Sequence, residues 1–164
     1  MKYAVRTLFV AMIFGLLELT NVGRYTTTTL SNLTTFALFR AAHDASLQVD
    51  PVLASEGYIV FMPDAAREAF METMSRNLGM KPDLTPKPGS FIEHPMEIVY
   101  EEFVDDSSGV TFPFNYRNDQ YHIYQTLEGP SVIYAVRIRA TSKSNFDYNG
   151  YLFRNIVQQY PFPG

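Results

Sequence analysis

The longest apolar run of the chain lies close to its N-terminus. Residues 3–19 are apolar apart from two charged side chains and one threonine, and the charged residues in and around the run are Lys2, Arg6, Glu18 and Arg24. The uncharged part, residues 7–17, would form roughly 17 Å of helix, whereas the hydrocarbon core of a bilayer is roughly 30 Å thick. The run therefore predicts membrane targeting, but it would span a bilayer poorly by itself.

Three interpretations fit this run: a short signal anchor, a cleaved secretory signal, and a helix that enters the membrane before it joins a protein assembly. Cleavage is disfavoured because no small-x-small site follows Leu19. Glu18 disfavours lipid as a permanent environment, because a carboxylate at that depth is costly without a partner. We expect the partner to be Lys2, Arg6 or the terminal amine of another subunit. In the alternative, Glu18 lies at the water interface near Arg24.

The helical pattern continues well beyond the apolar run. Three- and four-residue steps connect Leu30, Leu33, Phe36, Ala37, Ala41 and Ala45. This spacing predicts one apolar side of a helix. A helix over residues 3–48 would be about 70 Å long, and its small residues would allow other helices to approach closely. We therefore divide the chain into an N-terminal helix, residues 1–49, and a globular head, residues 50–164.

The pattern after Asp50-Pro51 predicts a mixed head. We expect a short buried strand at 57–62, a helix at 63–78 that Gly79 ends, and a proline-rich connector at 82–89. An antiparallel meander at 96–157 follows, because apolar and polar residues alternate at 135–140. Its expected strands are 96–104, 121–126, 132–141 and 151–157, with a hairpin turn at 128–131 and another at Asn149-Gly150.

The first 50 residues resemble the TadE-like minor pilins of the tight-adherence pilus, a branch of the type IV pilin superfamily. The resemblance rests on the Gly-x-x-Glu motif of Gly15 to Glu18, on Gly23-Arg24, and on the Ala-rich step at residues 40–42. Gly23-Arg24 lies farther from Glu18 than in the family, and no prepilin-peptidase site is recognisable. A leader that has already been removed and insertion without cleavage are both compatible with this.

The resemblance implies an α+β, pilin-like fold in which a long N-terminal helix packs on a small antiparallel β-sheet head. It also implies a structural subunit of an extracellular pilus-like filament that serves adhesion or surface contact. Such a subunit passes through the membrane, where a pilus assembly machinery handles it, and then polymerises with copies of itself. The residues expected at the subunit contacts are Lys2, Arg6, Gly15, Glu18, Arg24, Leu30, Leu33, Ala37 and Ala41. A minor pseudopilin that primes or caps a filament, and a signal-anchored extracytoplasmic binding module, are the alternatives.

Composition and motifs point away from enzymes and nucleic-acid binders. The net charge of -4, without a basic cluster, disfavours nucleic acid as a partner, and the chain contains no cysteine. His43, His94 and His122 share no metal-ligand spacing, and no phosphate loop or nucleophile motif is present. We therefore expect no enzymatic activity, no cofactor and no metal.

Two further groups of residues are each compatible with two interpretations. The acidic group Glu101, Glu102, Asp105 and Asp106 could bind a hard cation, although a solvated strand end fits its spacing better. The tyrosine-rich stretches 112–124 and 145–153 suit either a contact surface or the core of the head.

Overall fold

The computed structural model describes residues 2–90, 92–140 and 150–162; the side chains at 1–5, 7–8, 19–27 and 140 lie outside this description. The described chain is α+β and combines helices with antiparallel sheet, as the sequence predicts. Its elements are α1 (Lys2–Ser46), α2 (Pro51–Ser55), α3 (Pro63–Leu78), β1 (Met96–Val104), β2 (Phe114–Asn118), β3 (Ile123–Leu127), β4 (Ser131–Ala140) and β5 (Gly150–Gln159).

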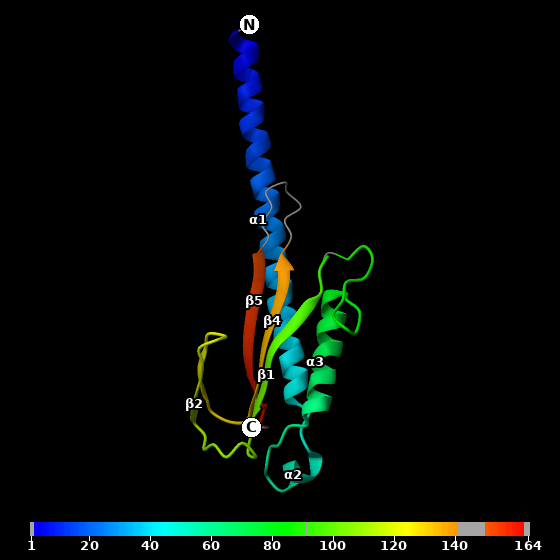
Figure 1. Cartoon of the computed structure of the whole chain (residues 1–164), viewed down its shortest axis with the longest axis vertical. Coiled ribbons are helices and arrows are strands. Elements are labelled where there is room, and N and C mark those ends of the chain that lie inside the picture. Colours follow the sequence, from blue (N-terminus) through cyan, green and yellow to red (C-terminus); the bar gives the residue numbers. More distant parts are fainter. Residues whose placement is uncertain (1, 91, 141–149, 163–164) are drawn as a thin grey trace.

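Helix α1 has two parts with different surroundings. Its N-terminal half projects beyond the rest of the molecule, whereas its C-terminal half lies between α3 and the sheet (Figure 1). The buried side of the C-terminal half consists mainly of small residues, which allow the neighbouring elements to approach the helix axis closely. These buried residues are Leu30, Thr34, Ala37, Leu38, Ala41, Ala42, Ala45 and Ser46.

Helix α3 begins and ends where local sequence chemistry requires. Pro63 occupies the first turn, where a missing N–H costs nothing, and Gly79 ends the helix in a left-handed conformation with φ of 64°. The buried face packs against α1 and contains Ala66, Phe70, Thr73, Met74 and Ser75.

The conformation of Gly79 gives a first prediction. We expect Gly79→Ala to lower the free energy of unfolding by about 1 kcal/mol, because an L side chain at positive φ meets its own backbone. No other heavy atom lies within 4 Å of a Cβ built at this position, so the loss is a backbone effect. Urea unfolding of both proteins measures it. Gly79→Asn is the control and should lose less, since asparagine tolerates this conformation; an equal loss in both variants would contradict the explanation.

The main sheet has the antiparallel order β1-β4-β5, and β2 and β3 form a separate hairpin. Strand β4 is the central strand and is buried on both faces. Tyr134, Val136 and Ile138 join the helices in the main core, whereas Ile133 packs into a second core under the β2–β3 hairpin. The expected alternation at 135–140 is confirmed where side chains are described, because Val136 and Ile138 are buried and Arg139 is exposed.

Three predictions about the strands need correction. Residues 57–62 form no strand, and only one bridge joins Phe61 to Val49. Residues 128–131 are not a hairpin turn, because β3 and β4 belong to different sheets. Strand β2 lies between residues 104 and 121, where the sequence predicts no strand. The turn expected at Asn149-Gly150 falls at residue 149 outside the described residues, and β5 begins at Gly150.

The passage from β3 to β4 explains why these strands do not pair. Pro130 has no N–H to continue a ladder, and its carbonyl accepts a hydrogen bond from the amide of Tyr160, at 2.8 Å, beyond β5. A Cβ on Gly129 would lie 2.8 Å from the side-chain nitrogen of Gln159, so only glycine passes there without displacing that side chain. The chain thus changes layers at this point.

Candidate functional site

The most unusual surface of the molecule is the projecting part of α1, which we call the free segment (residues 9–18). Its large apolar side chains are all exposed: Phe9, Val10, Met12, Ile13, Phe14, Leu16 and Leu17. At 3.6 residues per turn these positions cover roughly 200° of the helix circumference. The remaining sector carries Ala11, Gly15 and Glu18. Contiguous apolar surface of this kind marks an interaction site.

Within the described residues, no helix contains a stretch that is both long enough and apolar enough to cross a membrane.

Five of the nine predicted contact residues lie in the N-terminal half of α1. Arg6, Gly15 and Glu18 are exposed, and a Cβ added at Gly15 would meet nothing within 4 Å. Lys2 and Arg24 lie on the same helix, but their side chains are outside the described set. Arg6, Gly15 and Glu18 are therefore accessible to another molecule.

The other four predicted residues need a correction. Leu30, Ala37 and Ala41 are buried by the chain's own sheet and α3, so they hold α1 on the head and present no surface to another subunit. Leu33 is 42% exposed and remains accessible. The predicted stripe contained residues from two sides of α1. Steps of three and four residues connect the buried residues to the exposed Leu33, so the spacing alone does not separate the two sides.

Three residues that the sequence analysis did not select extend the exposed surface along the head. Phe36 and Phe39 are 54% and 55% exposed, and the guanidinium of Arg40 stacks on the Phe36 ring at 4.6 Å from its centroid. With Leu33 they form a mixed apolar and cationic side of α1 that we call the head stripe (Leu33, Phe36, Phe39 and Arg40). A sequence signal existed, since Phe36, Phe39 and Arg40 follow the same i, i+3, i+4 spacing as Phe14, Leu17 and Glu18.

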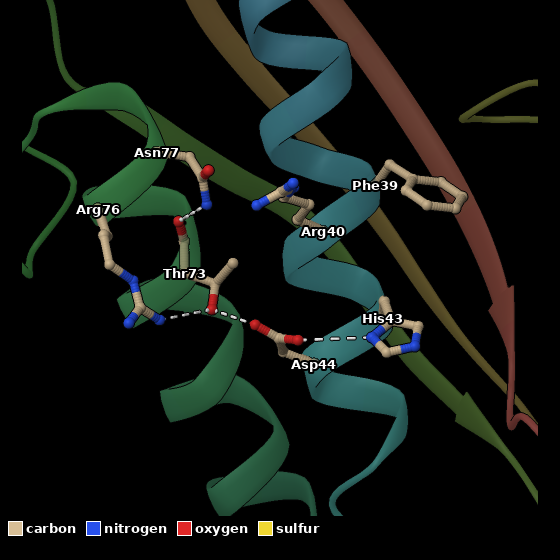
Figure 2. A pocket seen from close by; sticks show the side chains of 7 residues that line it. All are labelled: Phe39, Arg40, His43, Asp44, Thr73, Arg76 and Asn77. Atoms are coloured by element: carbon tan, nitrogen blue, oxygen red, sulfur yellow. Dashed lines mark hydrogen bonds and ion pairs between the residues drawn. The ribbon is translucent and has the colours of Figure 1, made fainter.

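An open cleft of about 580 Å³ adjoins the head stripe between α1 and α3 (Figure 2). Arg40 points into it from α1 toward α3, and Phe39 projects from α1 about 100° further round the helix. The lining residues are Phe39, Arg40, His43, Asp44, Thr73, Arg76 and Asn77.

The polar contacts of the cleft leave its positive charge in excess. Asp44 accepts a hydrogen bond from the Thr73 hydroxyl at 2.6 Å and lies 3.5 Å from His43 Nδ1. Arg76 donates to the Thr73 hydroxyl at 3.3 Å and lies 3.8 Å from the exposed Glu72 carboxylate. None of the ion pairs among the described side chains includes Arg40. With two guanidinium groups and one carboxylate, the lining suits an anionic group.

The acidic group after β1 is used inside the chain. Asp105 is buried and accepts the amide of Phe61 at 2.9 Å and the amide and hydroxyl of Ser107 at 3.0 and 2.6 Å. Asp106 accepts the amide of Ile59 at 2.6 Å. These carboxylates replace the partner strand that residues 57–62 lack. In the described part of the chain, no group of three or more histidine, aspartate and glutamate side chains is placed to hold a metal ion.

The other two acids of that group are also engaged. Glu101 accepts hydrogen bonds from Arg67 and its side chain is only 9% exposed. Glu102 accepts hydrogen bonds from the hydroxyls of Tyr100 and Tyr116. Burial, together with the hydrogen bond to Glu102, raises the pKa of the Tyr116 hydroxyl well above its usual range. Both tyrosines therefore stay neutral donors at physiological pH.

The tyrosine-rich stretches divide between core and surface. Tyr121 stacks on Tyr100 at 4.6 Å between ring centroids and on Phe153 at 6.1 Å, beneath the β2–β3 hairpin. Tyr124 and Tyr151 are exposed and lie beside Arg117 and Arg137. Residues 145–149 of the second stretch lie outside the described residues. Both interpretations of these rings therefore hold for part of the set.

The three histidines are separated in the structure as in the sequence. His43 lies in the cleft beside Asp44. His94 precedes β1 and His122 occupies the β2–β3 turn with φ of 52°.

None of the known protein-family models matches the chain, and no curated protein or solved structure is significantly similar to it.

Proposed function

We propose that this protein is the structural subunit of an extracellular, type IV pilus-like filament that polymerises through α1 and serves adhesion or surface contact. The observation that carries the proposal is the exposure of seven large apolar side chains over more than half of the circumference of the free segment. A helix with a narrow apolar stripe can be covered by one neighbour, but a helix with so wide an apolar face needs more than one neighbour to cover it.

The energetics favour removal of the free segment from water. Removing one large apolar side chain from water contributes about 1.5–3 kcal/mol, and the free segment offers seven of them. Before assembly the same surface suits the membrane, where a pilus assembly machinery would collect the subunits. In the filament, the free segments would form an apolar core and the heads would form the outer wall.

Glu18 is the charged residue of the free segment, and its carboxylate must be neutralised in such an apolar core. A carboxylate that leaves water is tolerated only beside a cation or several hydrogen-bond donors. None of the described ion pairs within the chain includes Glu18, so a neighbouring subunit is the natural source of the cation. Lys2, Arg6 and the terminal amine of a neighbour are candidates on the N-terminal half.

Two alternatives share parts of this surface. A minor pseudopilin would use the same helix to prime or cap a filament of another protein, and its low share of the fibre mass would identify it. A signal-anchored binding module would keep α1 alone in the membrane, and Glu18→Ala would then leave its function unchanged.

The proposal is tested by replacing one apolar side chain of the free segment with a charged one. We expect Phe14→Asp to abolish surface fibres, because the aspartate would be buried without a partner in the filament core. The measurement is the amount of the protein in fibres sheared from cells, quantified by immunoblot and viewed by electron microscopy. Val52→Asp is the matched control, since Val52 is an equally exposed apolar residue on α2.

The control should leave fibres at the wild-type level. Recovery of the wild-type protein only as a monomer, in the membrane or in the medium, would overturn the proposal.

A further inference from the structure

Two opposite charges on α1 have matching surroundings. Glu18 follows Phe14 by four residues and Leu17 by one, and Arg40 follows Phe36 and Phe39 with the same spacing. Both groups are exposed, and none of the ion pairs of the described side chains includes either charge. The separation between the two groups is 22 residues. Because 22 residues make close to six helical turns, both groups lie on nearly the same side of α1.

We propose that Arg40 binds Glu18 of a second copy of this chain, with the two α1 helices parallel and offset by 22 residues. This inference rests on the proposed filament function and assigns the contact that sets its register. In this register Phe14 of the second copy lies level with Phe36, and its Leu17 lies level with Phe39. These apolar contacts and the Glu18–Arg40 ion pair thus form along the same stretch of helix.

The cleft beside Arg40 can receive the carboxylate. Arg40 already faces the cleft and stacks on Phe36, which holds the guanidinium in place. His43 and Arg76 line the same cleft, and the oxygens of Asp44 face Thr73 and His43. An arginine with free donors binds a carboxylate well, since its planar fork matches the two oxygens.

The offset also fits the dimensions of the molecule. Twenty-two residues of helix correspond to roughly 33 Å. This shift places Leu30 of the second copy, the first buried residue of α1 among the described side chains, level with position 52 of the first copy. Helix α1 ends before that position, at Ser46. Leu30 of the second copy therefore lies beyond the end of the first copy's α1, and the free segment of the second copy lies along the first head.

The direction of the second helix follows from the residues around the ion pair. An antiparallel arrangement with the same Glu18–Arg40 pair would place the apolar ring of Phe14 level with Asp44. It would also close into a two-fold dimer, because both ion pairs would form between the same two copies. The parallel arrangement is heterologous, so each copy binds a different neighbour at each end and the chain of contacts continues into a filament.

Charge reversal tests the ion pair. We expect Glu18→Arg and Arg40→Glu each to reduce the fibre yield at least tenfold, and the double variant to recover most of it, since the pair is restored with opposite polarity. Lys87→Glu, a reversal at an exposed lysine of the connector, is the control and should assemble normally. Failure of the double variant to recover, while wild-type fibres form, would overturn the pairing but not the filament.

Cysteine pairs test the register and direction, because the chain contains no native cysteine. Fibres of a Phe14→Cys, Phe36→Cys variant should give a ladder of covalent oligomers on a non-reducing gel after mild oxidation. The matched variant Phe14→Cys, Asp44→Cys should give none. Dimers from the second variant, or no ladder from the first, would overturn the parallel offset. If wild-type protein forms no fibres at all, the inference and the proposed function fall together.

Discussion

Phe70→Ala is expected to lower the free energy of unfolding by about 3–5 kcal/mol, which is a large share of the total stability of an ordinary domain. Phe70 is fully buried in α3, and its ring stacks on Tyr134 of the central strand at 3.9 Å between centroids. Its removal leaves a cavity between α3, α1 and the sheet that rigid neighbours cannot fill. Urea unfolding of the detergent-solubilised full chain, followed by the near-ultraviolet signal of the tyrosines, measures the loss.

Phe36→Ala is the matched control for this substitution. It removes the same ring from an exposed position on α1, so the stability of the unassembled chain should change by no more than about 0.5 kcal/mol. Equal losses from both substitutions would mean that α3 does not pack on the sheet as described.

Asp105→Ala is expected to cost about 2–4 kcal/mol, because it leaves the buried amide of Phe61 without an acceptor. The same carboxylate also holds the amide and hydroxyl of Ser107, and Asp105 is only 4% exposed. The loss would loosen the segment between α2 and α3 before the rest of the molecule. Hydrogen exchange should therefore show early loss of protection at Phe61.

Asp106→Ala is the comparison for Asp105. Asp106 accepts the amide of Ile59 from an exposed position, where water can replace it, so we expect a loss of about 1 kcal/mol. Its effect on exchange should be confined to Ile59. Unchanged protection of Phe61 in Asp105→Ala would show that the carboxylate does not hold this segment.

The sequence pattern predicted the elements whose signals lie within a few residues of one another. Helix α3 follows a proline, an apolar period and a glycine, and each of these acts within a few residues. Strand β1 has the predicted bounds, and β4 shows the alternation of Val136 and Ile138 with more exposed arginines. Local signals sufficed because none of these three elements depends on an unusual partner.

The missed elements depend on contacts between distant residues. Strand β2 is formed by a polar sequence whose one buried ring, Tyr116, is held by Glu102 and Tyr100 from β1. Residues 57–62 look like a strand, yet Asp105 and Asp106 supply acceptors that a neighbouring strand would otherwise provide. Neither partnership has a spacing that a single sequence displays.

The sequence pattern also did not show which residues of α1 are exposed. Apolar residues occur on several sides of this helix, so Leu30 and Leu33 belong equally well to one stripe, although the first is buried and the second exposed. The spacing of Phe36, Phe39 and Arg40 repeats that of Phe14, Leu17 and Glu18, but only the cleft formed with α3 shows where the charge of Arg40 is directed.

The position of β5 against α1 has a consequence for biosynthesis. Arg154 of β5 donates a hydrogen bond at 2.6 Å to the Ser31 hydroxyl of α1, across 123 residues of chain. Strand β5 is thus made long after the part of α1 that it covers. Until β5 is made, that surface of α1 remains open to water or to other chains, so premature association is a hazard during synthesis. Contacts of such long sequence separation also make folding slow, which gives a holding chaperone time to act.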